Sequence, residues 1–268
     1  MTEPSRAPYA LAMNAPIVIT GGTSGIGLAI RSRLEDRGYA LINLDLVEPE
    51  TNAPHIACDL SVPPSIDQAI AALPGEISAL LCVAGVGPLP DQPEKVMRIN
   101  FLGTRRLAEH LLARIRPEGT ITLVASSAGR DWRDNRDHVD AMLKTPSFEA
   151  GVEWLAEHPE AWIDNPYKFS KQCLAAYTYH AVGLAQPLGI RVNCINPGIT
   201  QTNLSDDFRQ LLGGETYDRI VDLTGRAGRP EDIAGLAEFL SVGDSHWING
   251  VEITADGGYY AGVVAGRH

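Results

Sequence analysis

The sequence predicts an α/β fold built on a parallel sheet, and three observations lead to this fold class. Short apolar runs alternate with segments of helical periodicity along the chain. The first apolar run passes directly into a glycine-rich turn and a helix. No repeat, low-complexity tract or linker divides the 268 residues, so we expect one domain over 16–268, preceded by a flexible tail, 1–15.

The composition excludes several classes of protein. Hydrophobic residues make up 44% of the chain, enough for a sizeable core, and the formal net charge is −11. An acidic chain without a Lys/Arg cluster does not suit a nucleic-acid partner, because phosphate backbones need a basic face. No apolar run approaches the length of a membrane span, and the four cysteines stand far apart. We therefore expect a cytoplasmic protein with buried free thiols and with no metal site or membrane partner.

The first strand, turn and helix have the features of a pyrophosphate site. The apolar run 16–20 precedes the turn, and apolar residues recur at helical spacing after it. Glycines permit a tight turn and close backbone approach, while a helix N-terminus offers free N–H groups and a positive dipole end. A plain glycine loop is the alternative that this element alone leaves open. The candidate cofactor-binding residues here are Gly21, Thr23, Ser24, Gly25, Ile26 and Gly27.

Acidic residues follow the next two apolar runs. The run 40–44 ends in Asp45, at the place where a carboxylate can accept hydrogen bonds from an adenosine ribose. A carboxylate repels a 2′-phosphate, and neither the loop nor the positions just after Asp45 supply an Arg or Lys to bind one, so we expect NAD as the cofactor. Residues 56–60 predict a third strand ending in Asp59 and Leu60, which suit the edge and face of an adenine ring. An ordinary strand-end carboxylate is the alternative for Asp45.

Two further strands bring polar or small residues to the same edge. The apolar run 79–83 is followed by Ala84 and Gly85, where backbone can approach a cofactor closely. Residues 119–125 predict a fifth strand with Ser126 at its carboxyl end, the edge at which open parallel sheets bind ligands. Between them, Asn100 falls inside a helical stripe over 93–115. A lone mid-helix Asn is most often solvated or a cap, and a strand-end Ser alone is as readily a turn former as a functional residue.

The segment 130–164 breaks the alternation and predicts an inserted helical excursion. Charged residues fill its first part, which we expect to be a solvated face, and Trp154, Leu155 and Trp162 follow. These apolar residues either roof a pocket for an apolar substrate or pack against their own domain.

Tyr167 and Lys171 stand four residues apart near the start of a helix predicted to run to about Ala185. At this spacing both side chains lie on one face, so Lys171 is expected to lower the pKa of the Tyr167 phenol and make it an acid or base near neutral pH. Because such pairs also arise by chance, an ordinary helix with a solvated lysine is the alternative.

The C-terminal third completes the pattern. A sixth strand over 191–195 leads into a turn suited to contact with a carboxamide, formed by Pro197, Gly198, Ile199, Thr200 and Thr202. The polar, glycine-containing segment 199–225 is predicted to be a mobile flap over the substrate. A helix from Pro230 and a last strand from Glu252 follow.

Taken in order, these features resemble the short-chain dehydrogenase/reductase family, in its compact single-domain group, over residues 16–258. The resemblance implies a Rossmann-type doubly wound parallel sheet of about seven strands with helices on both faces. It also implies an Asn-Ser-Tyr-Lys tetrad. Tyr167 would be the acid/base, Lys171 would bind the nicotinamide ribose and depress the phenol pKa, Asn100 would hold the helix geometry and a relay water, and Ser126 would orient the substrate oxygen. The family's strand-end spacing superposes on Gly119, Ser126 and Gly129, which favours Ser126 over Ser127.

Two departures from the family pattern are informative. The usual Asn-Asn-Ala-Gly is replaced by the sequence at 82–85, and the segment between Ser126 and Tyr167 is longer than usual. With the turn 84–88, this insertion is most similar to the bacterial 3α-hydroxysteroid dehydrogenase/carbonyl reductase branch. That resemblance implies an NAD-dependent oxidoreductase for a hydrophobic, cyclic alcohol (steroid, terpene or aromatic) and its ketone or aldehyde, working as a homodimer or homotetramer. A sugar-nucleotide epimerase or dehydratase and a non-catalytic nucleotide-binding sensor stay open as alternatives.

Overall fold

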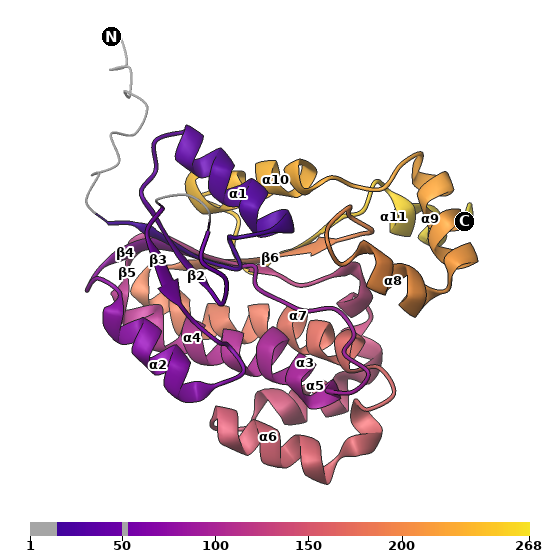
Figure 1. Ribbon diagram of the computed structural model, residues 1–268, viewed down its shortest axis with the longest axis horizontal. Helices are drawn as coiled ribbons and strands as arrows, with labels where there is room; N and C mark the ends of the chain where they lie inside the picture. Colours follow the sequence, from indigo (N-terminus) through magenta and orange to yellow (C-terminus); the bar gives the residue numbers. More distant parts are fainter. Residues whose placement is uncertain (1–14, 50–52) are drawn as a thin grey trace.

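The computed structural model describes residues 15–49 and 53–268. Seven parallel strands form one sheet in the order β3-β2-β1-β4-β5-β6-β7, and helices cover both of its faces (Figure 1). The predicted α/β fold class is therefore confirmed. Of the predicted N-terminal tail, all but Ala15 lies outside the described residues.

The order of the strands predicts a ligand-binding crevice beyond their carboxyl ends. The strands are β1 (Ile17–Thr20), β2 (Leu41–Asp45), β3 (His55–Ala57), β4 (Ile77–Cys82), β5 (Ile115–Val124), β6 (Arg191–Pro197) and β7 (Glu252–Ala255). β1 pairs with β2 on one side and with β4 on the other, so the direction of winding changes at β1. Doubly wound sheets bind ligands beyond the carboxyl ends of the strands at such a point.

The third strand is shorter than the sequence predicted. It ends at Ala57, so Asp59 and Leu60 lie beyond it. The cause is a local turn: the Asp59 carboxylate accepts hydrogen bonds from the Ser61 amide at 2.8 Å and from the Ser61 hydroxyl at 2.6 Å. A side chain that binds its own backbone two residues on competes with strand pairing.

Alternate side chains of the strands enter two separate cores. In β1, Ile17 and Ile19 pack with helices α1 (Gly25–Asp36) and α10 (Pro230–Val242), whereas Val18 packs on the opposite face. That face is covered by α2 (Pro63–Ala72), α4 (Thr104–Leu111) and α7 (Pro166–Ala185). Because both faces of the sheet are buried, its central strands are continuous apolar runs.

The helix predicted over 93–115 has an irregular middle. It starts as α3 (Pro93–Met97), continues as a π-helical turn over Arg98–Gly103, and becomes α4 before a short 3₁₀ turn leads into β5. Asn100 lies in the π-helical turn and is fully buried. Single π turns inside helices are frequent at functional sites, and apolar periodicity does not reveal them.

The insertion is helical, as predicted, and lies on the outside of one helix layer. It contains a 3₁₀ turn over Trp132–Asn135, α5 (Arg136–Leu143) and α6 (Phe148–Glu157), and α6 is the outermost helix below α7 in Figure 1. Leu155 and Trp162 are buried in the core, and the indole of Trp162 donates a hydrogen bond to the Leu155 carbonyl at 2.8 Å. The apolar residues of the insertion therefore pack against their own domain.

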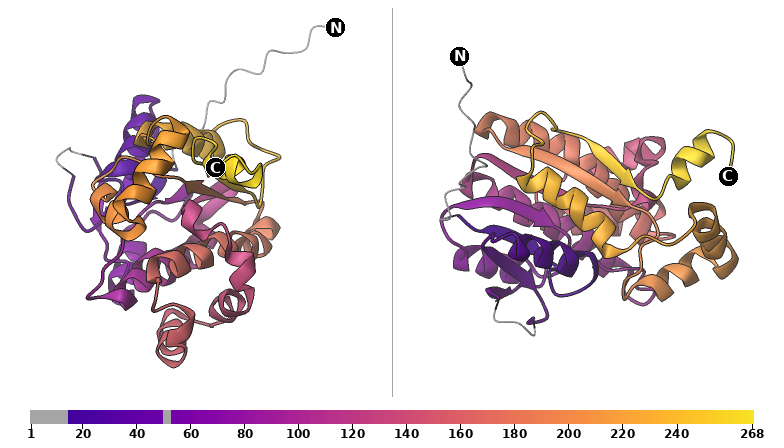
Figure 2. Two further views of the ribbon diagram at one scale, coloured as in Figure 1. Left: turned by 90° about the vertical axis from the view of Figure 1, so that its right-hand side faces the viewer. Right: turned by 90° about the horizontal axis from the view of Figure 1, so that it is seen from above.

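The segment 199–225 carries two helices, α8 (Ser205–Leu212) and α9 (Gly214–Thr224). With the C-terminal α11 (Tyr259–Val264), they form a group at one end of the sheet (Figure 2). None of the helices in the described ranges has the length and apolar character that a membrane span needs. All four cysteines are buried and free, as predicted.

Candidate active site

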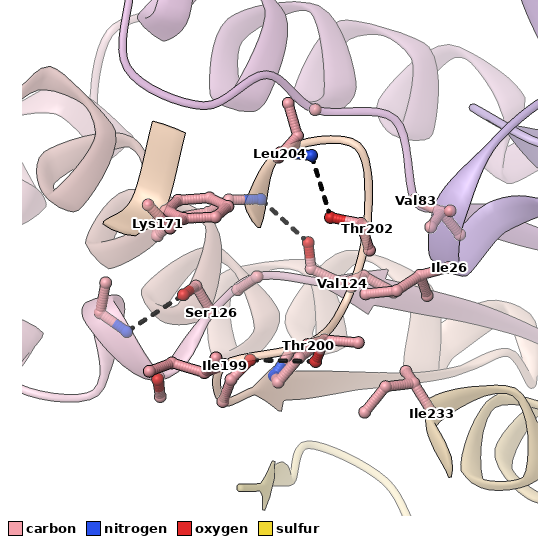
Figure 3. A pocket seen from close by; sticks show the side chains of 18 of the residues that line it. Ile26, Val83, Val124, Ser126, Lys171, Ile199, Thr200, Thr202, Leu204 and Ile233 are labelled. Atoms are coloured by element: carbon pink, nitrogen blue, oxygen red, sulfur yellow. Dashed lines mark hydrogen bonds between the residues drawn. The ribbon is translucent and has the colours of Figure 1, made fainter. Parts of the chain in front are cut away.

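A cavity of about 860 Å³ lies beyond the carboxyl ends of the strands, and Figure 3 shows part of its lining. Nearly all of the candidate residues from the sequence line it: Gly21, Ser24, Gly25, Ile26, Gly27, Asp45, Asp59, Leu60, Ala84, Gly85, Ser126, Tyr167, Lys171, Pro197, Gly198, Ile199, Thr200 and Thr202. Two candidates, Thr23 and Asn100, are not part of the lining. The structure thus brings the nucleotide-type turn and the tyrosine–lysine pair into one cavity.

The glycine turn is held against the end of β4 by contacts that leave no room for side chains. Gly21 has a φ of 72°, and a β-carbon there would lie 2.7 Å from the Ala84 Cα. A β-carbon on Gly27 would overlap the Gly21 carbonyl oxygen. The spacing of these glycines therefore has a steric cause. Because they carry no side chains, their backbone atoms form this part of the cavity wall.

The end of β2 supports this turn from the other side. The Asp45 carboxylate accepts hydrogen bonds from the amides of Thr23 at 3.2 Å and Val47 at 3.3 Å. The Thr23 hydroxyl donates to the Val47 carbonyl at 2.9 Å, so its side chain is turned toward this loop instead of the cavity. Buried Asn43 accepts from the Gly22 amide at 2.9 Å and donates to the Thr23 hydroxyl at 3.0 Å. Sequence reasoning missed Asn43, although a polar residue inside a buried strand is a signal.

The turn after β4 is held without the asparagine side chains typical of the family. The buried Thr20 hydroxyl accepts hydrogen bonds from the amides of Val83 and Ala84, both at 3.0 Å. Asn100 accepts from the Val86 amide at 2.8 Å and donates to the Val86 carbonyl at 3.0 Å. Asn100 thus fixes the turn from behind the cavity wall, and its position depends on the π-helical turn.

Helix α7 begins where local sequence signals place it. The Asn165 side chain accepts a hydrogen bond from the Lys168 amide at 2.9 Å, and Pro166 occupies the first helical position. Tyr167 and Lys171 then share one face, with the lysine Nζ 5.8 Å from the centre of the tyrosine ring. The same Nζ donates to the Val124 carbonyl at the end of β5, at 3.2 Å (Figure 3).

Burial dominates the electrostatics of this pair. It raises the pKa of Tyr167 to about 12, and a hydrogen bond with Ser126 opposes this shift without cancelling it. Burial also lowers the pKa of Lys171 to about 8. The expected fall of the phenol pKa toward neutral is therefore not seen in this structure, where burial raises it. Helical spacing does not reveal how deeply a pair is buried.

Ser126 is the serine that the structure pairs with Tyr167. Its hydroxyl accepts a hydrogen bond from the Ala128 amide at 3.1 Å and also bonds the phenol. Gly129 packs so closely on α7 that a β-carbon would overlap the Lys171 carbonyl. The turn that carries Ser126 is therefore fixed to the helix that carries Tyr167.

The remaining wall comes mainly from the segment 199–225. Phe208 packs against Tyr167, and the apolar lining here also includes Leu204, Leu211, Leu212 and Ile220. From the insertion, only Arg130 reaches the cavity. Of the two alternatives for the aromatic residues of 130–164, packing against their own domain is the one the structure shows, since Trp154 and Trp162 lie in or against the core and outside the cavity lining. Sequence reasoning missed both Phe208 and Arg130, for which no local motif exists.

Comparisons with known proteins agree with this geometry. Residues 17–129 match the NAD dependent epimerase/dehydratase family, and residues 154–260 match a family described as enoyl-(acyl carrier protein) reductase. The chain is 33% identical to coniferyl-alcohol dehydrogenase of Pseudomonas sp. (strain HR199 / DSM 7063), over 91% of this chain and 96% of that protein. The chain belongs to the short-chain dehydrogenase/reductase family. As a member of this family, it is an oxidoreductase of alcohols or carbonyl compounds.

Two further members of the family resemble the chain over most of its length. The 3α-hydroxysteroid dehydrogenase/carbonyl reductase of Comamonas testosteroni is 27% identical, over 90% of this chain and 95% of that protein. The crystal structure of the 3α-hydroxysteroid dehydrogenase from Pseudomonas sp. B-0831, complexed with NADH, superposes with a TM-score of 0.79 at 26% identity. That match covers 95% of this chain and all of that one (100%).

Proposed function

We propose that the protein is an NAD-dependent alcohol dehydrogenase that interconverts a hydrophobic, cyclic alcohol and its ketone or aldehyde. The observation that carries this proposal is that Ser126, Tyr167 and Lys171 line the same cavity as the glycine turn and Asp45. Two relatives, a coniferyl-alcohol dehydrogenase and a 3α-hydroxysteroid dehydrogenase, are named for alcohols that contain rings. The apolar wall from α8 and α9 supports a substrate of this kind.

The residues of the cavity fit a dinucleotide. A β-carbon on Gly85 would lie 3.2 Å from the Asn100 side-chain oxygen and 3.4 Å from the Lys171 Nζ, so this glycine leaves room next to the lysine. Asp45 would accept hydrogen bonds from the adenosine ribose, and the adjacent Leu46 and Val47 supply no charge for a 2′-phosphate. These features support NAD over NADP.

Tyr167 is the proposed acid/base, with the substrate oxygen placed between it and Ser126. The chemistry that a bound NAD would supply is acceptance of the hydride from the carbinol carbon. In oxidation the Tyr167 phenolate removes the hydroxyl proton, and in reduction the neutral phenol donates a proton to the carbonyl oxygen. Because the phenol pKa is raised to about 12, oxidation should accelerate toward alkaline pH. Lys171 would bind the nicotinamide ribose, and Asn100 positions the turn at Val86.

The experiment that tests this proposal measures NADH formation with a panel of cyclic and aromatic alcohols. Replacement of Tyr167 by Phe removes only the phenolic oxygen, so turnover should fall by at least about a hundredfold. Affinity for NAD, measured by calorimetry, should be retained. Tyr39→Phe is the matched control, since Tyr39 is half-buried beside the core under α1, outside the cavity lining. Wild-type turnover in Tyr167→Phe would contradict the proposed role.

A further inference from the structure

Arg130 is a cation in the cavity wall, and no carboxylate of the described residues forms an ion pair with it. Within the described ranges it forms no ion pair. The other cavity-lining arginine, Arg226, is paired with Asp232 at 2.6 Å. The next arginines of the insertion are also paired: Arg133 with Glu252 at 3.5 Å and Arg136 with Asp140 at 3.1 Å. Arg130 therefore brings to the cavity a positive charge that forms no ion pair within the described part of the chain.

Two contacts fix the orientation of this guanidinium. Its Nη1 donates a hydrogen bond to the Ser127 carbonyl at 3.0 Å, and its central carbon lies 4.6 Å from the centre of the Tyr260 ring. A guanidinium has five N–H donors arranged in a plane. Within the described residues, the Arg130 guanidinium donates one hydrogen bond, the one to Ser127. Its other donors are free to bind a ligand.

Arg130 lies close in sequence to Ser126, one of the residues proposed to bind the reacting oxygen. It follows Ser126 by one 3₁₀ turn (Ser127–Gly129), which is fixed against α7. A substrate with its hydroxyl at Ser126 and Tyr167 would meet the apolar side chains of α8 and α9 along its body. Arg130 then offers the one arginine without an ion pair among the described lining residues to a second polar group of the substrate.

We propose that Arg130 determines specificity by binding a carboxylate on the substrate, so that the preferred alcohols are hydrophobic, cyclic hydroxy acids. This inference rests on the proposed function, because it assumes that the hydroxyl lies at Tyr167. The planar fork of an arginine matches the two oxygens of a carboxylate. Since the chain carries a formal net charge of −11, an anion is repelled by most of the molecule and needs such a local cation.

The test compares alcohols that differ only in a carboxylate. Benzyl alcohol and para-(hydroxymethyl)benzoate form one pair, and cyclohexanol and its ring-carboxylated analogues form a second. Binding in the presence of NADH is measured by calorimetry, and turnover with NAD by absorbance. The wild-type protein should bind a carboxylated member roughly tenfold or more tightly, as expected for a charge-assisted hydrogen bond.

Arg130→Met should abolish this preference, measured as the ratio of affinities for the carboxylated and the neutral member of each pair, and Arg130→Lys should retain part of it. Arg136→Met, which removes an exposed charge from the same insertion, is the control and should behave as wild type. An equal effect of Arg130→Met on both members of each pair, or no carboxylate preference in the wild type, would overturn the proposal. Carboxylate-selective binding without turnover of any alcohol would instead contradict the dehydrogenase function and leave the Arg130 site standing.

Discussion

The ring of Phe208 packs edge-on against the ring of Tyr167, with centroids 5.0 Å apart and planes inclined by 61°. Phe208 belongs to α8, whereas Tyr167 lies in the first turn of α7, so the segment 199–225 contacts the proposed acid/base directly. Tyr167 is 7% exposed, and burial is the main cause of its raised pKa. The position of α8 therefore affects both the size of the substrate pocket and the acidity of the phenol.

Phe208→Ala should weaken alcohol binding and make the phenol more acidic. Removal of the ring takes away an apolar contact worth about 1.5–3 kcal/mol when fully buried, so KM for cyclic alcohols should rise roughly tenfold. Water would reach Tyr167 more easily, and the pKa seen in the pH profile of oxidation should move down from about 12 toward its ordinary value. Steady-state kinetics over a range of pH values measures both effects.

Two variants make the Phe208 result specific. Phe208→Leu keeps an apolar side chain beside the phenol and should show the smaller effect. Phe239→Ala removes a ring that is 40% exposed on α10 and outside the cavity lining, and should leave KM and the pH profile unchanged. If Phe208→Ala kept the wild-type KM and pH profile, α8 would have no part in the substrate site.

Asp45→Asn should reduce the preference for NAD over NADP without disrupting the glycine turn. The amide oxygen of asparagine can still accept a hydrogen bond from the Thr23 amide, which Asp45 binds at 3.2 Å. The substitution removes the negative charge that repels a 2′-phosphate. The ratio of kcat/KM for NAD to that for NADP should therefore fall by about tenfold or more.

The control for Asp45→Asn is a variant that removes a charge outside the cavity. Asp36→Asn removes a carboxylate at the far end of α1, away from the cavity lining, and should leave the ratio as it is in the wild type. Equal use of NAD and NADP by the unmodified protein would refute the role of Asp45 from the outset.

Much of the fold and the site follows from local rules in the sequence. Strands buried on both faces appear as apolar runs, and the glycine spacing reflects the overlap that any β-carbon on Gly27 would create with Gly21. The spacing of Tyr167 and Lys171 sets their common helix face. Asn165 and Pro166 mark the start of that helix in the sequence itself.

What the sequence did not reveal depends on tertiary contacts. The raised pKa of Tyr167 comes from burial by α8 and neighbouring elements, which its helical spacing cannot show. The π-helical turn around Asn100 leaves no mark in the apolar period. Likewise, the sequence around Trp162 and Leu155 looks the same whether these residues face a cavity or the core. The packing of the insertion against α7 determines that they face the core.

Lys171→Met should make the protein more stable near neutral pH while it abolishes activity. Burial lowers the pKa of Lys171 from 10.5 to about 8. Below about pH 8 the folded chain must therefore keep a charge in a buried place, at a free-energy cost of about 3 kcal/mol for a shift of about 2.5 pKa units (10.5 − 8). Methionine removes that charge but leaves the Val124 carbonyl without its 3.2 Å partner, which costs about 1 kcal/mol.

The difference in stability between the variant and the wild type should depend on pH. Between about pH 8 and 10.5 the unfolded lysine binds more protons than the folded one, so this group makes the free energy of unfolding of the wild type rise with pH. The advantage of Lys171→Met, about 2 kcal/mol near pH 7, should therefore shrink across that window. Urea denaturation at several pH values, without added nucleotide, measures it. Lys168→Met is the control, because Lys168 is 42% exposed and paired with Asp131. A variant that is no more stable than the wild type near pH 7, or whose advantage grows with pH, would show that Lys171 is not a buried charge.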